Sequence, residues 1–133
     1  MSRVKGANTK PEWIVRRLLH GMGYRYRLYR KDLPGTPDIV FLGRRKAIFV
    51  HGCFWHRHQG CRLTTTPKTR AAFWKEKFEA NEERDRRKFR ELDTMGWRYL
   101  VIWQCETRDE KDSKRRLSEF LGPTRIRLPS NQK

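Results

Sequence analysis

The first hydrophobic pattern along the chain has the spacing of an amphipathic helix. Pro11 suits a first helical turn, whereas Gly21 and Gly23 favour the end of a helix. Glu12 lies in the first turn, where a carboxylate complements the helix dipole. We predict a helix over residues 11–21 whose apolar face is formed by Ile14, Val15, Leu18, Leu19 and Met22.

Four later segments have strand patterns. Residues 24–31 (YRYRLYRK) alternate aromatic and basic side chains, which predicts a strand with one basic face: either a charged, solvated edge strand or a nucleic-acid surface. Residues 39–42 and 47–50 are apolar throughout and are typical of strands buried on both faces. Residues 97–103 (WRYLVIW) are so hydrophobic that we expect them to form a central strand.

The hairpin between the two apolar strands brings chemically active side chains together. A turn over residues 33–37 (LPGTP) delivers Asp38 to the mouth of the first strand. If the hairpin closes over Arg44 and Arg45, His51 lies directly opposite Asp38, although a shift in register of one or two residues stays open. The sequence therefore predicts a carboxylate and an imidazole at the open end of the hairpin, which is a geometry suited to a catalytic site.

Two further helices complete the expected elements. A polar linker over residues 64–69 precedes a helical region over residues 69–95, in which Asn81 is a candidate break and which Gly96 ends. Residues 113–121 form a short amphipathic helix. Together with the strands, these elements predict an α/β fold.

Composition narrows the partner. The 133 residues suit one domain, residues 1–133, with a basic arm over residues 1–9 and a basic tail over residues 123–133. A net charge of +17 indicates a polyanionic partner, most simply nucleic acid, although a solvated surface or a ribosome-associated protein has the same signature. The chain has no run of transmembrane length and no signal-peptide core, so we expect a cytoplasmic protein.

Residues 51–61 (HGCFWHRHQGC) carry the densest chemistry. Imidazole and thiolate are the usual ligands of zinc, and histidine also suits proton transfer near neutral pH. A Cys3His site fits the spacing C-x4-H-x2-C with a distant fourth ligand, formed by Cys53, His58, Cys61 and Cys105. Such a site is closed and structural, but spacing alone leaves His51 and His56 open as the imidazole ligand. The alternative is three ordinary buried thiols.

Several segments together resemble one family. They are residues 8–12 (NTKPE), 33–38 (LPGTPD), 49–56 (FVHGCFWH), 73–75 (FWK), 84–87 (RDRR) and 96–98 (GWR), together with Asn81. In these motifs the chain is similar, from about residue 8 to residue 106, to the very-short-patch-repair (Vsr) DNA mismatch endonucleases. The resemblance implies a restriction-endonuclease-like fold of the PD-(D/E)xK superfamily, with a mixed central sheet flanked by helices and a structural zinc site. It also implies a monomer that uses Mg²⁺ to nick double-stranded DNA next to the thymine of a T:G mismatch, in bacterial cytoplasm at the nucleoid.

The resemblance also implies roles for individual residues. Asp38 and the backbone carbonyl of Val50 would bind Mg²⁺, and His56 would activate the attacking water, with His51 and Glu12 as further catalytic residues. Zn²⁺ would be held by Cys53, His58, Cys61 and Cys105. The aromatic side chains that wedge into the duplex would be Phe54, Trp55 and Trp74, although packing in the core is the commoner fate of aromatics.

Two departures from the family and two rival readings accompany the resemblance. The chain shares one feature in which the family differs from most nucleases of this fold: they carry Glu-x-Lys on the strand after their Pro-Asp, whereas here that strand ends Phe49-Val50-His51, with histidine in place of lysine. Gln104 replaces a usual acidic residue, and the segment before Glu12 is short. A non-catalytic, zinc-stapled nucleic-acid-binding protein would also explain the charge and the cysteines. A nuclease of the same fold with a different lesion specificity is the second rival.

Overall fold

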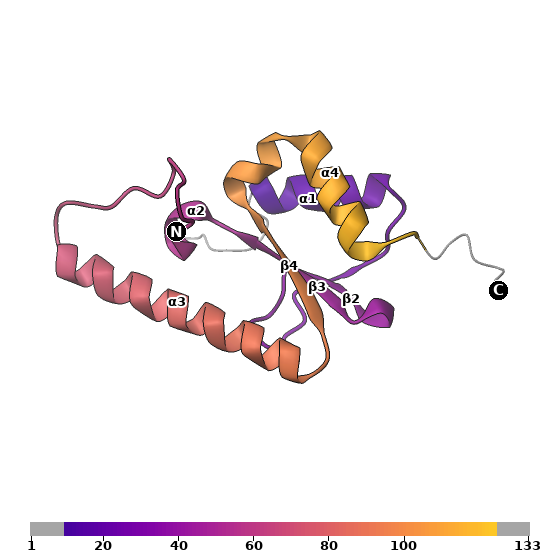
Figure 1. Ribbon diagram of the computed structural model, residues 1–133, viewed down its shortest axis with the longest axis horizontal. Coiled ribbons are helices and arrows are strands. Elements are labelled where there is room, and N and C mark those ends of the chain that lie inside the picture. Colours follow the sequence, from indigo (N-terminus) through magenta and orange to yellow (C-terminus); the bar gives the residue numbers. More distant parts are fainter. Residues whose placement is uncertain (1–9, 125–133) are drawn as a thin grey trace.

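Four strands form one mixed sheet in a computed structural model that describes residues 10–124 (Figure 1). The predicted arm over residues 1–9 and the tail from residue 125 lie outside the described residues. The strand order is β1-β2-β3-β4; the first two pairs are antiparallel and β3 runs parallel to β4. The strands are β1 (Arg27–Leu28), β2 (Ile39–Phe41), β3 (Lys46–His51) and β4 (Arg98–Trp103).

Helices cover both faces of this sheet. Figure 1 shows α1 (Lys10–Gly21) and α4 (Glu110–Leu121) on one face and the long α3 (Ala71–Thr94) on the other. The one-turn helix α2 (Cys53–His56) follows β3, and two 3-10 turns, η1 (Leu42–Arg44) and η2 (Gln104–Arg108), follow β2 and β4. Within residues 10–124, no helix is both long enough and apolar enough to cross a membrane.

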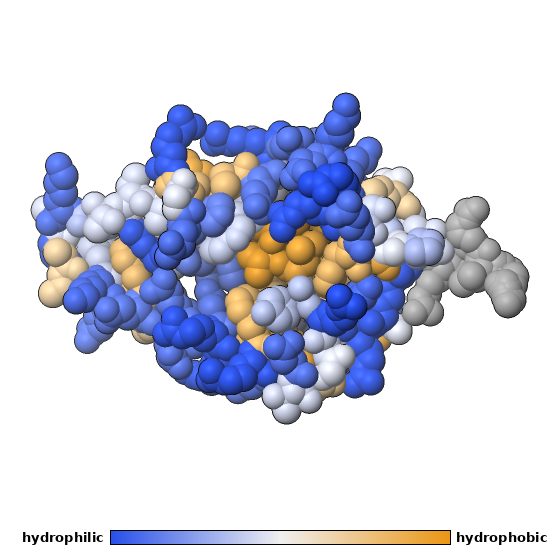
Figure 2. Space-filling view, in the orientation of Figure 1, coloured by the Kyte–Doolittle hydropathy of each residue, from blue (hydrophilic) through white to orange (hydrophobic). Residues whose placement is uncertain are grey.

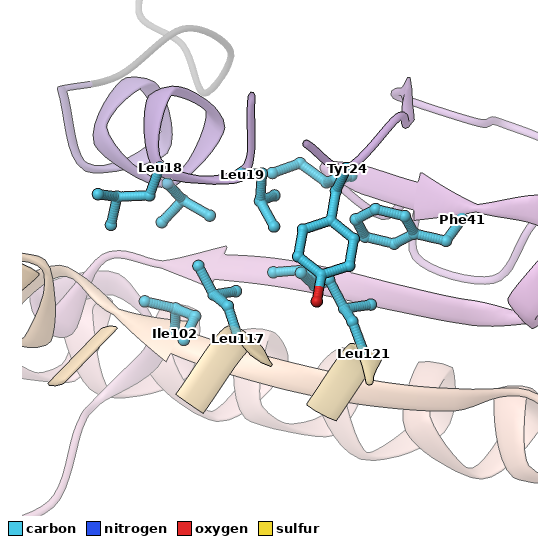
Figure 3. Close-up of a cluster of buried hydrophobic side chains, with 10 residues drawn as sticks. Leu18, Leu19, Tyr24, Phe41, Ile102, Leu117 and Leu121 are labelled. Carbon is cyan, nitrogen blue, oxygen red and sulfur yellow. The ribbon is translucent and has the colours of Figure 1, made fainter. Parts of the chain in front are cut away.

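The core has two parts, one on each face of the sheet. The side chains between the sheet and the helices α1 and α4 include Leu18, Leu19, Tyr24, Phe41, Ile102, Leu117 and Leu121 (Figure 3). The part beside α3 contains Leu33, Val40, Ala47, Phe49, Leu92 and Trp97. Strand β2 is buried at every position, and it contributes to both parts of the core. The expectation of strands buried on both faces is therefore confirmed for β2.

The predicted register of the hairpin is wrong by two residues. Ile39 pairs with Ile48, and Phe41 pairs with Lys46, because η1 and the left-handed Arg45 (φ 56°) form a wider turn than a closure over two arginines. Continued by one position, this register sets Asp38 beside Phe49 rather than His51. The side chain of Asp38 then reaches the backbone of the next residue along β3.

Strand β4 lies at an edge of the described sheet, so the prediction of a central strand is wrong. It pairs only with β3 among the described strands, and most of its residues are half-buried. Figure 2 shows a hydrophobic patch on this side of the molecule, between the regions where Figure 1 draws α3 and α4. The hydrophobic sequence of residues 97–103 is explained by the parallel pairing of β4 with β3, because helices cover both faces of a parallel strand.

Other elements differ from expectation in extent. Strand β1 is shorter than the predicted residues 24–31, and α3 continues through Asn81 without a break. The Asn81 side chain donates a hydrogen bond to the carbonyl of Trp55 (3.4 Å), so this polar residue joins α3 to α2. The short helices α2 and η2 were not predicted, because single turns have no hydrophobic period of their own.

Candidate active site and metal centre

The turn that follows β3 separates two groups of side chains. Gly52 precedes the single helical turn of α2, and Arg57, in the left-handed region with φ 55°, ends it. The guanidinium of Arg57 lies 3.9 Å from the centre of the Phe78 ring and holds the turn against α3. Two residues beyond β3, Cys53 joins one group, and five residues beyond β3, His56 joins the other.

The first group has the donor set and spacing of a zinc site. Nδ1 of His58 lies 3.6 Å from Sγ of Cys53 and 3.5 Å from Sγ of Cys105, and these atoms and Sγ of Cys61 all lie within 4.8 Å of one another. In a tetrahedral zinc site, Zn–S bonds of about 2.3 Å and Zn–N bonds of about 2.0–2.1 Å place sulfur and nitrogen about 3.5 Å apart. The four residues therefore fit a bound metal ion, and His58 rather than His56 lies among the thiols.

Neighbouring groups support this cluster. Trp103 stacks on His58 with ring centroids 4.1 Å apart, which orients the imidazole. The backbone N–H of Leu63 donates to Sγ of Cys61 (3.4 Å), and it lowers the pKa of that thiol to about 6. Burial raises the pKa of Cys53 and raises that of Cys105 to about 12, so these two thiols would ionise only with a cation bound beside them.

Asp38 is a half-buried carboxylate of the second group. Its Oδ2 accepts a hydrogen bond from the backbone N–H of Val50 (2.7 Å). Burial raises the pKa of Asp38 to about 6, against the opposing effect of the Val50 N–H, and the negative charge of Glu12 adds to the rise. A buried carboxylate beside a second acid is a site that gains from a cation.

Glu12 is a buried acid in the first turn of α1. Its side chain is 1% exposed; it accepts a hydrogen bond from the hydroxyl of Tyr29 and lies 3.8 Å from Nη1 of Arg16. The negative charge of Glu12 contributes to the raised pKa of Asp38, and the backbone N–H of Tyr29 donates to the carbonyl of Asp38 (3.3 Å). Glu12 therefore lies near Asp38, with Tyr29 in contact with both residues.

Two histidines stack in the same site. The rings of His51 and His56 are 3.7 Å apart at their centroids and nearly parallel (9°). Nδ1 of His56 lies 2.7 Å from Oδ2 of Asp85, which orients the ring and leaves Nε2 to face a substrate. His51 is only 3% exposed, and burial, together with the charges of His56 and Lys88, lowers the pKa of His51 to about 2. Of the two, His56 is the one equipped to exchange a proton.

Sequence reasoning missed two residues of the site, Asp85 and Lys88. Both lie on α3, one turn apart, and Nζ of Lys88 lies 3.1 Å from Oδ1 of Asp85. Burial acts against ionisation of Asp85, but the hydrogen bond with His56 and the charge of Lys88 outweigh it and lower the pKa of Asp85 to about 2. The only signal in the sequence was the RDRR motif, which does not say what its aspartate contacts.

An open pocket of about 380 Å³ gives access to these groups. His56 and Asp85 line it, along with the basic side chains of Arg84, Arg87 and Lys88 from the same helix. Glu91 also lines the pocket, and Lys88 is paired with Asp85, so Arg84 and Arg87 are the cations best placed to contact an anionic group such as a phosphate.

The predicted wedge residues come together between α2 and α3. Ring centroids of Phe54 and Trp55 are 5.1 Å apart, and each lies 5.8 Å from the centroid of Trp74. Trp55 is 48% exposed, whereas Phe54 is half-buried and packs against Phe78 at 5.2 Å. The core-packing alternative therefore applies to Phe54 in part and not to Trp55.

Comparison with known proteins identifies the family. The profile of the family described as DNA mismatch endonuclease Vsr matches residues 1–62. The type II nicking enzyme V.XorIIP of Xanthomonas oryzae pv. oryzae is 55% identical over 124 residues, which cover 93% of this chain and 90% of that protein. The chain belongs to the Vsr family. The DNA mismatch endonuclease Vsr of Escherichia coli is 43% identical over 91% of this chain and 78% of its own length.

A solved structure supports the same conclusion. The catalytic domain of the homing endonuclease I-Bth0305I superposes with a TM-score of 0.60 at 25% identity, over 85% of this chain and 94% of that domain. This Vsr-family protein is therefore a DNA endonuclease with a restriction-endonuclease-like fold, and it belongs to DNA mismatch repair. The predictions of family, fold class and enzyme class are confirmed, and the reading as a non-catalytic binding protein is excluded.

Proposed function

We propose that this Vsr-family endonuclease cuts one strand of duplex DNA beside the thymine of a T:G mismatch, with Mg²⁺ bound at Asp38. The observation that carries the proposal is that the half-buried carboxylate of Asp38 feels the charge of His56, whose ring stacks on His51 and is oriented by Asp85. Hydrolysis of a phosphodiester needs a cation to stabilise the developing negative charge and a base to deprotonate the attacking water. In this proposal Asp38 binds the cation and His56 is the base.

The residues around Asp38 fit a hard cation. Its Oδ2 is engaged by the Val50 N–H, which leaves Oδ1 of the carboxylate for a metal ion, and the proposal adds the backbone carbonyl of Val50 as a second oxygen ligand. Bound there, Mg²⁺ would neutralise charge on the phosphate that is attacked. The raised pKa of Asp38 supports this assignment, because a carboxylate that is disfavoured as a lone buried anion is stabilised by a cation.

His56 takes the proton in the proposed reaction. Its Nδ1 donates to Asp85, so the lone pair on Nε2 can accept a proton from water, and Asp85 stabilises the imidazolium that forms. His51 supports the ring of His56 by stacking against it. Glu12, held by the Tyr29 hydroxyl, adds a second carboxylate near Asp38.

The aromatic cluster supports the preference for a mismatch. The exposed face of Trp55, backed by Phe54 and Trp74, would enter the duplex and unstack a base step. Unstacking costs less where the bases are mismatched, so a wedge favours mismatched substrates. A nuclease of this fold that acts on another lesion would keep the same metal-binding and base residues and would differ in this aromatic cluster.

The thiol cluster supports a structural role for Zn²⁺. Cys53, His58, Cys61 and Cys105 supply four ligands, and a complete tetrahedron leaves no position for water or substrate. The ion would join α2 to the end of β4 and so hold His56 at the site. We further propose a monomer that acts in the bacterial cytoplasm, where the chromosomal DNA lies.

The test is cleavage of labelled duplexes containing a T:G pair, other mismatches or none, in Mg²⁺ or in EDTA. We expect Mg²⁺-dependent cutting of one strand of the T:G duplex, no cutting by Asp38→Ala with binding retained, and a rate lowered about 10²–10⁴-fold by His56→Ala. Asp93→Ala removes an exposed carboxylate near the end of α3, two helical turns beyond Asp85, and should cut normally. Cutting by Asp38→Ala at the wild-type rate would overturn the site, and equal cutting of all duplexes would overturn the specificity.

A further inference from the structure

Lys88 is a largely buried cation between α3 and the sheet. Its side chain is 12% exposed, and Nζ lies 4.1 Å from the centre of the Phe49 ring. Gly35 covers its stem so closely that a Cβ at that position would lie 2.4 Å from Cδ of Lys88. The Phe49 ring and the loop at Gly35 therefore fix the position of the ammonium group. A lysine side chain in solvent would be mobile.

The ammonium group of Lys88 is linked to both histidines, to His51 directly and to His56 through Asp85. Nζ lies 3.1 Å from Oδ1 of Asp85 and 3.2 Å from Nε2 of His51, while the other carboxylate oxygen of Asp85 is 2.7 Å from Nδ1 of His56. One cation is thus bonded directly to one histidine and, through a single carboxylate, to the other.

The direction of these hydrogen bonds follows from the chemistry of the groups. An ammonium group only donates, so Nε2 of His51 accepts, and the ring proton of neutral His51 resides on Nδ1. Within residues 10–124, Nδ1 of His51 is buried and has no hydrogen-bond partner in the protein. His51 therefore turns an unpaired N–H donor, rather than a lone pair, toward its surroundings.

An ordinary ion pair on the same helix makes the difference clear. Arg86 and Glu83 are also spaced i, i+3 and lie 2.8 Å apart, but their side chains are 63% and 51% exposed. Such an exposed ion pair contributes little to the stability of the protein. Lys88 and Asp85 are largely buried, and each also contacts a histidine of the site.

We propose that Lys88 is a positioning residue of the nicking site: it sets the tautomer of His51 and, through Asp85, the orientation of His56. This proposal rests on the proposed function only in assigning the two histidines to strand cutting. It adds a requirement for a fixed positive charge supplied by α3, and it gives His51 the role of a hydrogen-bond donor.

The first test reads the tautomer without DNA or Mg²⁺. Long-range ¹H–¹⁵N spectra distinguish Nδ1–H from Nε2–H imidazole, and His51→Gln assigns the signal. We expect Nδ1–H in the wild type, a shift toward Nε2–H in Lys88→Met, and the wild-type tautomer in Lys88→Gln, whose amide can still donate. Unchanged spectra in a folded Lys88→Met would overturn the proposal. If Lys88→Met does not fold, Nε2–H in the wild type would overturn it instead.

The second test measures single-turnover cutting of the mismatched duplex. Lys88→Met should lower the rate roughly 10- to 100-fold with little change in the substrate concentration for half-maximal rate. In a double-mutant cycle with Asp85→Asn, the two losses should combine to less than their product, because both act on His56. Lys111→Met, on the exposed face of α4 with the same change in charge, should cut normally.

Losses that multiply, or a Lys88→Met rate equal to the wild type, would contradict the proposal. If the wild type cuts no mismatched duplex at all, the proposed function fails while the tautomer test still stands on its own.

Discussion

Oδ2 of Asp85 lies 2.7 Å from Nδ1 of His56, although 29 positions separate the two residues in the chain. The contact joins the middle of α3 to the turn after β3. It determines which nitrogen of His56 is free, and so it makes this histidine, rather than the buried His51, the proton acceptor of the proposed reaction.

The Asp85–His56 contact predicts the effect of removing one charge. Asp85→Asn should slow strand cutting roughly 10- to 100-fold while binding of the duplex stays within a factor of about two, because the carboxylate orients the base and does not hold DNA. Single-turnover rates and a binding titration measure the two quantities. Glu83→Gln, an exposed acid on the same helix, is the matched control. A loss of binding equal to the loss of rate would contradict this role.

The thiol cluster predicts one zinc ion per chain and a stability that depends on it. Cys105→Ala should lose the metal and unfold at a temperature lower by several degrees, because a ligand that binds only the folded state contributes its binding free energy to folding. Elemental analysis and thermal unfolding give both quantities. His56→Ala should retain the zinc, since His58 is the imidazole among the thiols. Zinc-free wild type with unchanged stability would contradict a structural metal.

The raised pKa of Asp38 predicts a pH-dependent gain in stability when the carboxyl group is removed. The pKa is about 6 in the folded protein and 3.8 ordinarily, so the folded state binds this proton more tightly. The contribution of Asp38 to stability is therefore complete below about pH 4 and is lost as the pH rises through 6.

In metal-free protein, Asp38→Asn should accordingly raise the free energy of unfolding at pH 8 by up to about 3 kcal/mol and change it little at pH 4. Denaturant unfolding at the two pH values is the measurement, with Asp93→Asn as the control. Added Mg²⁺ should narrow the difference at pH 8, because it stabilises only the wild type. If Asp38→Asn were less stable than the wild type at pH 8, the ionised carboxylate of Asp38 would not destabilise the folded protein.

The exposed ring of Trp55 predicts a loss of discrimination. Trp55→Ala should reduce the preference for T:G over fully paired DNA by roughly 5- to 100-fold, since stacking of a base on an aromatic ring contributes about 1–3 kcal/mol. Competition cleavage of the two duplexes measures it. Trp13 is 56% exposed on α1, outside the aromatic cluster, and Trp13→Ala should keep the preference. Equal losses in the two variants would contradict the wedge.

Gly35 predicts how closely the loop before Asp38 must approach α3. Gly35→Ala meets two obstacles, a φ of +74° and a Cβ that would lie 2.4 Å from Cδ of Lys88. We expect a loss of about 1–2 kcal/mol in unfolding free energy together with slower cutting, because the side chain of Lys88 must move. Gly60 has a similar φ of +68°, but no atom lies within 4 Å of a Cβ at that position. Gly60→Ala is therefore the control that has the backbone strain without the displacement of Lys88. Identical cutting by the two variants would remove the link to Lys88.

The sequence by itself determined the elements and the types of chemistry. The first helix, the two apolar strands and the cluster of thiols and imidazoles in residues 51–61 are all local patterns, and local geometry follows from the spacing of neighbouring residues. The motifs were also specific enough to identify the Vsr family, which the relatives confirm.

Only the tertiary structure decided which groups meet. The hairpin register, and with it the bond between Asp38 and the backbone of Val50, depended on a turn that the sequence leaves ambiguous by two residues. The choice of His58 for the thiol cluster depended on how α2 ends, and the edge position of β4 depended on the packing of helices. Asp85 and Lys88 were hidden among the charges of α3, because periodicity shows which face of a helix is apolar but not which polar side chain is buried against a distant strand.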